Sequence, residues 1–429
     1  MRMRGQLGVL VAAIASGCFE DSTPPPSSGT TTPGTDDTIG PGPTADDSTS
    51  GGADATAGSG PTAGTGDETA TDTGELPPPM CGDGTPVPGE LCYGDTSVVM
   101  ANDPPASARL GDVTGNASVD LVYLAASQVV VHAGDGGGNF GPAIFDAAVG
   151  GLRFELADFD GDGELDMAAL ESGGPLRLLL GSGGASFASS DQVVVGSDPQ
   201  ALALGDLDGD GAMDAVVGTA ATGLLFVVLG GGDGSLSPEP AVLTGADAHG
   251  LALGDLDGDG NLDVALALRG AQPGVAVAMG DGSGGLSTPA VVTDGSSGAR
   301  AVVAGDLDGD GRTDLAYLAD DGDVLGVLRS DGAGGFEAEQ VVGTGAGPSV
   351  LLAADLRRDG HDVLVVGHAG ENALRVYGLE GGAPTELLQV MLVAPAAALH
   401  HGDVNDDDVL DLAVTSSAPE IVTLVLSTP

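Results

Sequence analysis

The sequence predicts an all-β fold, a seven-bladed β-propeller preceded by a disordered acidic linker. Three observations support this fold class. An acidic loop recurs seven times at a nearly constant period, each period holds four short apolar segments separated by turn residues, and the two ends of the repeat region are complementary parts of one repeat. Four strands in a repeat of about 50 residues are typical of a propeller blade, and seven blades lie within the usual range.

The composition limits both the core and the partners. The 429 residues include 12 Lys+Arg and 63 Asp+Glu, which gives a formal net charge of −51. Because nucleic acid is bound by clustered cations, this balance excludes nucleic acid as a partner. All the basic residues are Arg, so chemistry that needs a lysine amine is excluded as well. With 75 glycines, no Trp and 3% aromatic residues, the core must consist mainly of Val, Leu and Ala in short strands joined by tight turns.

Residues 1–17 are predicted to be a lipoprotein signal peptide. Arg2 and Arg4 precede a mostly apolar stretch, Leu7 to Ala15, which is too short for a permanent membrane-spanning helix. Small residues then lead to Cys18, and they resemble a bacterial lipobox, whose cysteine is lipidated. The resemblance implies an exported protein that is anchored to the outer membrane or the cell surface through a lipid on Cys18. The alternative is ordinary cleavage nearby, with Cys18 discarded or left as a spare thiol.

Residues 18–80 are predicted to form a disordered linker, and residues 81–95 a short cysteine motif. The linker is rich in Thr, Ser, Pro, Gly and Asp and has almost no large apolar residue, so it cannot bury enough surface to offset chain entropy. We expect it to hold the rest of the protein away from a surface. If Cys18 is lipidated, Cys81 and Cys92 are the only thiols that remain in the exported chain, so a local disulfide is expected rather than a redox or metal site.

Residues 96–429 contain the repeats. In the clearest repeat an apolar run, Leu251 to Leu253, precedes the acidic loop GDLDGDGNLD, and the segments VALAL, VAVAM and TPAVV follow with glycine-containing turns between them. This is the pattern expected for four short strands. The loops are spaced 46 to 51 residues apart, and their first residues are Asp112, Asp158, Asp206, Asp255, Asp306, Asp355 and Asp403.

The ends of the repeat region indicate how the ring closes. The seventh repeat stops at VTLVLSTP, where its third strand is expected, so it lacks a fourth strand. Ser97–Met100, which lies before the first loop, aligns with the fourth strand of a repeat. We expect it to pair into the last blade, which closes the ring and removes an exposed edge. A β-helix normally has shorter periods, and a row of independent modules would not need complementary ends.

Four of the acidic loops carry the full pattern D-x-D-G-D-G-x-x-D. Carboxylates at alternate positions repel one another strongly unless a cation lies between them, and a set of oxygen ligands suits calcium. The glycine at position six permits the sharp turn, the residue at position seven offers its backbone carbonyl, and the Asp at position nine closes the coordination shell. The predicted ligand residues are Asp158, Asp160, Asp162, Glu164, Asp166, Asp206, Asp208, Asp210, Asp214, Asp255, Asp257, Asp259, Asn261, Asp263, Asp306, Asp308, Asp310, Arg312 and Asp314. The alternative is a solvent-exposed acidic hairpin without metal.

The other three loops depart from the pattern to different degrees. The first has only two charges, so weak binding is expected, but it keeps oxygen donors throughout: Asp112, Thr114, Asn116 and Asp120. The seventh has Asp408 in place of the turn glycine and keeps its ligands: Asp403, Asn405, Asp407 and Asp411. The sixth, DLRRDGHDV, has Arg357 at a ligand position and is expected to end one residue early, at Asp362. We expect its guanidinium to replace the ion, so the sequence predicts four to six calcium ions.

The repeats resemble the FG-GAP and VCBS units of integrin α-subunit-type propellers. The resemblance covers roughly residues 96–429, and the D-x-D-G-D-G-x-x-D loops are its specific part. It implies blades that carry a calcium loop between their first two strands. The phenylalanine-glycine and Gly-Ala-Pro elements are only partly present, as in GGNFGPA from Gly137 to Ala143, so binding of integrin-type ligands is not implied.

The candidate functions follow from what lies outside the loops. Catalysis needs a nucleophile or an acid–base pair, and none of the six histidines has a recognisable catalytic context, so we expect no enzyme; a propeller hydrolase or lyase is the remote alternative. His400 and His401 are expected to be ordinary blade-edge residues. A carbohydrate-binding, lectin-like propeller is the nearer alternative, although aromatic platforms are scarce. The leading hypothesis is a monomeric, calcium-stabilised surface module for adhesion or protein interaction, whose partner is an extracellular protein or glycan.

Overall fold

The computed structural model describes residues 15–16, 88–101, 105–125, 128–171, 173–293 and 298–428. Within the predicted signal peptide, only the short strand β1 (Ala15–Ser16) is described, and it pairs with β24. The rest of the signal peptide, the lipidation site Cys18, most of the linker and cysteine motif, and Cys81 lie outside the described residues.

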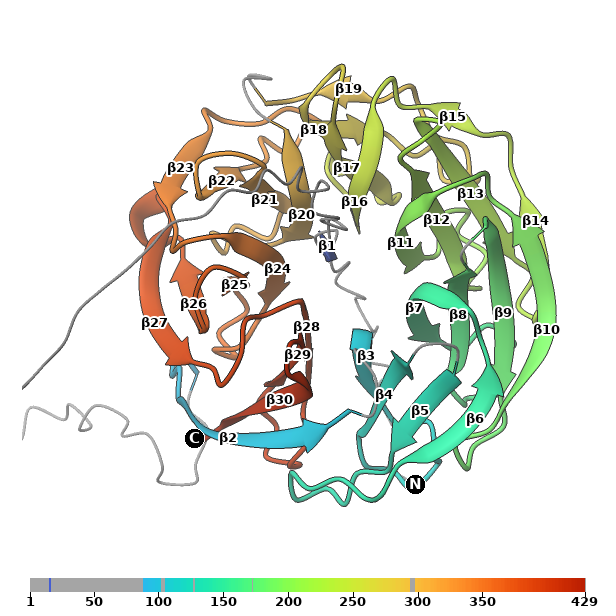
Figure 1. Ribbon diagram of the computed structural model, residues 1–429. Helices are drawn as coiled ribbons and strands as arrows, with labels where there is room; N and C mark the ends of the chain where they lie inside the picture. Colours follow the sequence, from blue (N-terminus) through green and yellow to red (C-terminus); the bar gives the residue numbers. More distant parts are fainter. Residues whose placement is uncertain are drawn as a thin grey trace, which may run out of the picture. The chain divides into compact units, whose positions relative to one another are not determined.

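Seven four-stranded antiparallel units form a closed ring, which confirms the predicted seven-bladed propeller (Figure 1). Each blade begins with the strand nearest the centre of the ring, and the following strands lie progressively further out. Blade 1 consists of β3 (Pro105–Gly111), β4 (Asp120–Ala125), β5 (Gln128–His132) and β6 (Ile144–Ala148). Blade 2 consists of β7 (Gly151–Ala157), β8 (Asp166–Glu171), β9 (Pro175–Gly181) and β10 (Phe187–Val194). Blade 3 consists of β11 (Pro199–Gly205), β12 (Asp214–Thr219), β13 (Leu224–Gly230) and an outer strand split into β14 (Leu236–Pro238) and β15 (Val242–Leu243).

The remaining blades repeat this order. Blade 4 consists of β16 (Asp247–Gly254), β17 (Asp263–Arg269), β18 (Gly274–Ala278) and β19 (Ala290–Val291). Blade 5 consists of β20 (Ala299–Gly305), β21 (Asp314–Ala319), β22 (Val324–Leu328) and β23 (Gln340–Gly343). Blade 6 consists of β24 (Pro348–Ala354), β25 (Val363–His368), β26 (Ala373–Gly378) and β27 (Thr385–Met391), with the 3-10 helix η1 (Glu380–Gly382) before β27. Blade 7 consists of β28 (Ala398–Gly402), β29 (Asp411–Ser417), β30 (Glu420–Ser427) and β2 (Tyr93–Met100).

The predicted closure of the ring is also confirmed. Strand β2 precedes the first blade in the sequence, yet it pairs antiparallel with β30 of the last blade, for example Ser97 with Leu424. The strand begins at Tyr93, four residues before the predicted start, and Tyr93 packs against the core cluster of blades 6 and 7. Cys92, just before it, is disulfide-bonded, and its carbonyl accepts a hydrogen bond from the amide of Thr428 at 2.9 Å.

The hydrophobic core lies between the blades. Second strands such as β12 and β25 are buried along their whole length, because neighbouring blades cover both faces of each sheet. Their sequences are accordingly almost continuous runs of Val, Leu and Ala. One cluster joins Val216 of blade 3, Leu266 of blade 4 and Val302 of blade 5, so each blade depends on its neighbours for burial.

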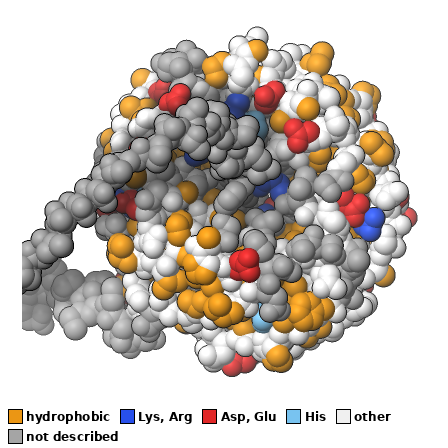
Figure 2. All heavy atoms as spheres, in the orientation of Figure 1, with side chains coloured by type: hydrophobic (Ala, Val, Ile, Leu, Met, Phe, Trp, Pro, Cys, Tyr) orange, Lys and Arg blue, Asp and Glu red, His pale blue; other side chains and the backbone are white. Residues whose placement is uncertain are grey.

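The exposed large hydrophobic side chains are mostly on the outer strands, for example Val194, Leu243 and Val341. On the face shown in Figure 2, hydrophobic side chains are scattered around the ring, with acidic side chains among them. Among the described residues, no helix has the length and apolar character needed to cross a membrane.

Candidate metal centres in the blade loops

Each acidic loop connects the innermost strand of a blade to its second strand. In blade 2 the loop begins at Asp158, directly after β7, and its ninth residue, Asp166, is the first residue of β8. The loop therefore has its first and last carboxylates at the ends of two paired strands, and the central carboxylates lie on the turn between them.

The turn requires a left-handed backbone at two positions. In blade 2 these are position four, Gly161, with φ 76°, and position six, Gly163, with φ 91°. The two oxygens of Asp158 accept hydrogen bonds from these two amides, at 2.7 and 2.9 Å. Glycine reaches this conformation without steric cost, which explains the D-G-D-G spacing. In the seventh loop Asp408 adopts φ 65°, so the loss of glycine there does not change the turn.

Four loops bring three carboxylates together. In each, one oxygen from every member of a triad lies within 4.8 Å of the others. Calcium binds oxygen at about 2.3–2.6 Å, so oxygens on opposite sides of one ion are about this far apart. The triads are Asp158, Asp160 and Asp166; Asp206, Asp208 and Asp210; Asp255, Asp257 and Asp259; and Asp306, Asp308 and Asp314. These are the four loops with the full sequence pattern, and each triad could hold a metal ion.

In the fourth and fifth loops the side chain at position seven contacts the carboxylate at position five. Asn261 donates a hydrogen bond to Asp259 at 3.0 Å, and Arg312 pairs with Asp310 at 2.9 Å. Coordination through the backbone carbonyl of position seven, for which the side chain is not needed, stays a prediction.

The Asp at position nine has a role that the sequence pattern did not reveal. It is fully buried in six repeats, and its two oxygens accept backbone hydrogen bonds from position two of the loop and from the end of the third strand. For Asp214 these come from Leu207 and Gly230, both at 2.8 Å. The residue therefore fastens the loop to the sheet. The sequence does contain a signal for this role, because the Asp at position nine directly precedes an apolar run and therefore starts a buried strand. The six residues are Asp120, Asp166, Asp214, Asp263, Asp314 and Asp411.

Burial also raises the pKa of five of these carboxyls, namely Asp166, Asp214, Asp263, Asp314 and Asp411. The pKa of Asp214 and Asp314 is raised to about 6, because burial and the neighbouring loop carboxylates oppose ionisation more strongly than the two backbone hydrogen bonds favour it. A cation held between the carboxylates would favour ionisation instead.

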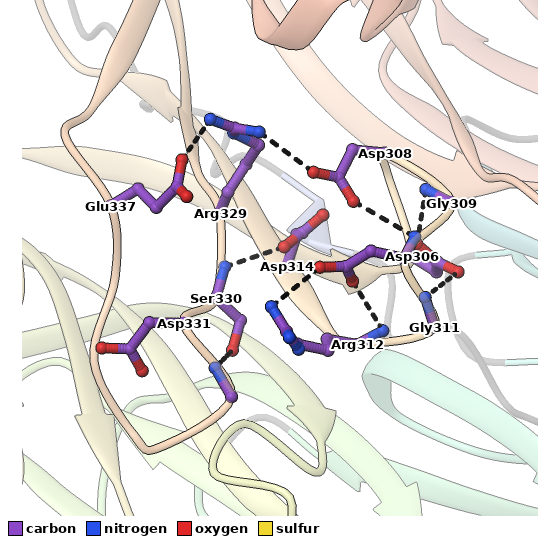
Figure 3. A network of polar contacts seen from close by, with 12 residues as sticks. Asp306, Asp308, Gly309, Gly311, Arg312, Asp314, Arg329, Ser330, Asp331 and Glu337 are labelled. Atoms are coloured by element: carbon purple, nitrogen blue, oxygen red, sulfur yellow. Dashed lines mark hydrogen bonds and ion pairs between the residues drawn. The ribbon is translucent and has the colours of Figure 1, made fainter.

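Blade 5 differs in that arginines pair with its loop carboxylates (Figure 3). Arg329, at the start of the turn after β22, contacts Asp308 at 3.1 Å and also pairs with Glu337. Arg312 pairs with Asp310. The negative charge of this loop is thus partly balanced by the protein itself.

The first and seventh loops have the same turn but not the same cluster. In the parts of the chain that the structure describes, their acidic groups do not form a triad of ligand atoms. In the first loop the side-chain amide of Asn116 donates a hydrogen bond to the backbone carbonyl of Gly134 at 3.0 Å. In the seventh, Asp407 accepts hydrogen bonds from Asn405 and from Ser427.

The sixth loop is not one residue short, as the sequence had suggested. The second strand starts at Val363, which occupies position nine, so the loop has the usual length and Asp362 occupies position eight. The misalignment arose because the Asp at position nine was replaced by Val while an Asp appeared one position earlier. The guanidinium of Arg357 pairs with Asp359 of the same loop at 3.0 Å, and its replacement of an ion stays a prediction.

The loops also lie at the joints between blades. In five repeats the backbone carbonyl at position two accepts a hydrogen bond from the turn after the third strand of the next blade. The acceptors are Val113, Phe159, Leu207, Leu256 and Val404, with distances of 3.0 to 3.3 Å. At the sixth loop the amide of Gly89, which lies within the cysteine motif, donates to the carbonyl of Arg357 at 2.7 Å. An ordered loop therefore orders the contact between two blades.

His400 and His401 lie on β28, the innermost strand of blade 7 and one edge of its four-stranded sheet, as expected from the sequence. Their rings are stacked, with centroids 5.5 Å apart. His400 accepts a hydrogen bond from the amide of Leu110 at 3.3 Å, and burial lowers the pKa of both histidines. They form part of the packing between the last and first blades.

Comparison with known proteins identifies the repeats. A family model described as FG-GAP-like repeat matches four overlapping segments, residues 158–217, 206–266, 255–317 and 306–366. Each segment begins at the first Asp of a loop with the full pattern. The chain therefore contains four FG-GAP-like repeats within a seven-bladed propeller. A search of the curated proteins finds no match.

Several solved structures share the fold. BBS1N, solved in complex with ARL6DN, matches with a TM-score of 0.58 and 12% identity, over 79% of this chain and 97% of that chain. An Agrocybe aegerita lectin that recognises non-reducing terminal N-acetylglucosamine matches with a TM-score of 0.51 and 19% identity, over 78% and 85% of the two chains. A chain of the COPII outer coat vertex on membranes matches with a TM-score of 0.51 and 12% identity, over 76% and 84%. At these identities the likeness concerns the fold alone.

Proposed function

We propose that this protein is a calcium-stabilised interaction module, held at the bacterial cell surface by a lipidated N-terminal stalk. The calcium part of the proposal is supported by four carboxylate triads, which lie in loops that contact the neighbouring blade. The FG-GAP-like propeller fold itself suggests a protein-interaction module.

Calcium is the cation that best suits these loops. The clustered side chains are carboxylates, which are hard oxygen ligands, and the triads contain no thiolate or imidazole that would favour zinc or copper. Without an ion, three carboxylates within 4.8 Å of one another repel. Calcium would remove this repulsion and hold the turn against the next blade, so it would stabilise the folded ring.

The partner is proposed to be a protein, with a glycan as the less favoured choice. Sugar sites commonly stack aromatic rings on the sugar, but the sequence has no Trp and only four Tyr, of which Tyr123 and Tyr377 are almost fully buried. Catalysis is not part of the proposal. Anchoring through Cys18 predicts that Cys18→Ala moves the protein from the membrane fraction to the soluble fraction of cells.

Thermal unfolding with and without calcium tests the proposal. A ligand that binds only the folded state stabilises it by about 1.4 kcal/mol per tenfold excess over Kd, and extracellular calcium sites typically have a Kd of about 0.1–1 mM. We expect the Tm to rise across millimolar calcium and to fall again with EDTA. Asp257→Asn, in the blade 4 triad, should weaken this response. Asp281→Asn, in an exposed turn of the same blade, should not. A melting curve that EDTA leaves unchanged would contradict the calcium hypothesis.

A further inference from the structure

The loop face of the ring contains a cavity of about 590 Å³ lined by residues of blades 3, 4, 5 and 6. This volume is in the range of small-ligand sites, roughly 300–1,000 Å³. Its lining is mainly apolar and comes from the ends of the inner strands and from position eight of the loops: Leu204, Leu253, Ala304, Met213 and Leu262.

Glycines before the loops shape the cavity wall. A Cβ on Gly205 would lie 2.7 Å from Leu262 of the next blade, and a Cβ on Gly254 would lie 2.6 Å from Thr313. Real Cβ atoms do not come this close to another non-bonded heavy atom, so glycine lets the side chain at position eight of each following blade lie directly over the inner strand. These side chains then form a continuous wall around the cavity.

The sixth repeat places a carboxylate in this wall. Its position eight is Asp362, which lines the cavity and accepts a hydrogen bond from the amide of Asp306 at 3.2 Å. The other six repeats have an uncharged residue at this position: Val119, Leu165, Met213, Leu262, Thr313 and Leu410. Asp362 is therefore the one charged side chain among the position-eight residues, and it belongs to the repeat whose loop is expected to bind no calcium.

The cavity as a whole carries negative charge. Besides Asp362, it is lined by the first residues of three acidic loops, Asp206, Asp255 and Asp306. Among the described residues that line it, Arg312 is the only cation, and its guanidinium already pairs with Asp310. Each of these three loops has four carboxylates, at positions one, three, five and nine. One divalent ion per loop would neutralise only two of these four charges, so the cavity stays negative when calcium is bound.

We propose that this cavity binds an amphipathic cation, namely a Lys or Arg side chain that protrudes from a partner protein. The aliphatic stem would lie against Leu253 and Leu262, and the charged head would pair with Asp362. The proposal rests on the proposed function as an interaction module and names the partner surface that it recognises. Charge complementarity supports it, because the net charge of −51 attracts a basic partner and repels an acidic one.

Dansylcadaverine, which joins an apolar fluorophore to a primary amine, probes this cavity, and neutral dansylamide is the matched ligand without the charge. The full chain is titrated in saturating calcium at pH 7.5 and fluorescence is recorded. We expect dansylcadaverine to bind at least tenfold more tightly than dansylamide. Asp362→Asn, which keeps the acceptor for the amide of Asp306, should weaken dansylcadaverine about tenfold and leave dansylamide unchanged. Ala304→Phe should abolish the binding of both by filling the cavity.

Asp331→Asn, in an exposed turn of blade 5, is the matched control and should bind both ligands as the wild type does. Thermal melts of every variant show whether the ring is folded. Equal affinities for the two ligands, or full binding by Asp362→Asn, would overturn the proposal. A calcium-dependent dimer that Ala304→Phe dissolves would overturn it too, since the occupant would then be a second copy. If calcium raises the Tm but neither ligand binds, the cavity proposal fails and the calcium proposal stands.

Discussion

The Asp at position nine, which is present in six of the seven loops, contributes both to the sheet and to the loop. It opens the second strand, where it is surrounded by apolar side chains, and its two oxygens accept hydrogen bonds from the loop and from the third strand. In the second and fifth repeats it also contributes an oxygen to a triad. The buried Asp therefore connects the order of the sheet to the order of the loop, and any ion bound in the triad would stabilise both.

His368 leads to a prediction on pH. It is completely buried at the end of β25, and its Nε2 accepts a hydrogen bond from the amide of Gly345 at 3.1 Å, which requires the neutral ring. Burial lowers its pKa below 6.5, although Glu371 nearby favours the charged form. Below pH 6.5 the unfolded chain therefore binds a proton that the folded protein does not. Stability should fall with pH until the folded-state pKa is reached, by at most about 1.4 kcal/mol per pH unit.

His368→Gln keeps an acceptor for Gly345 but does not titrate. Urea unfolding at pH 7.0 and pH 5.0 should show a smaller loss of stability at low pH in this variant than in the wild type. His361→Gln, at an exposed histidine, is the control and should behave as the wild type does. Identical pH slopes in His368→Gln and the wild type would rule the explanation out.

At the scale of the strands, the inner strands of blades 1 and 2 are joined by a buried ion pair. The guanidinium of Arg109 on β3 pairs with both oxygens of Glu155 on β7, donates to the carbonyl of Ala108 and lies over the ring of Phe154. Arg109 and Glu155 are only 3% and 8% exposed. A charge so deeply buried needs its partner, because the isolated ion would lose its hydration without compensation.

Removal of one partner of this ion pair should lower the free energy of unfolding. Arg109→Met is expected to reduce the free energy of unfolding by about 3–5 kcal/mol, because it leaves Glu155 buried without a partner. The double variant Arg109→Met, Glu155→Leu should recover most of that loss, since no charge remains. Arg177→Met, which removes a more exposed pair with Glu171 inside blade 2, should cost less than about 1 kcal/mol. Chemical denaturation measures all three, and a double variant as unstable as Arg109→Met would contradict the argument.

At the scale of the whole molecule, the ring is held closed by a strand from the other end of the repeat region. Strand β2 pairs with β30 over seven residue pairs, and it covers the edge of the last blade. Because the core lies between blades, an open joint would expose apolar surface on both sides of the gap. The stability of every blade therefore depends on this one pairing.

Deletion of residues 94–101 should destabilise the whole ring and not only blade 7. We expect a loss of at least about 3 kcal/mol, from the missing ladder hydrogen bonds at roughly 0.5–1.5 kcal/mol each and from the exposed core. Calorimetry should show a lower Tm and a broader transition, whereas deletion of an equally long piece of the linker, residues 40–47, should change neither. A cooperative transition at the wild-type Tm would disprove the closure mechanism.

Much of the fold and part of the site could be predicted from the residues alone. The repeat period, the four strands per blade and the four acidic loops that form triads recur along the chain, and the closing strand could be predicted because Ser97–Met100 matches the strand that the last repeat lacks. A turn with two left-handed positions needs glycine or a residue that tolerates this backbone, and carboxylates at alternate positions of such a turn must approach one another. The glycines and carboxylates of such a turn lie within a few residues of one another, so the turn can be predicted from the sequence.

The remaining features depend on how one blade is placed against the next. The carbonyl at position two, the pair of Arg109 and Glu155, and the cavity beside Asp362 each involve residues about 50 positions apart or more. The alignment of the sixth loop was wrong for the same reason: only the start of β25, set by pairing with β24, shows that Val363 occupies position nine. The sequence by itself determined the blade and its candidate ion-binding turn, and the tertiary structure decided what lies at the joints, because contacts there depend on the rotation between neighbouring sheets.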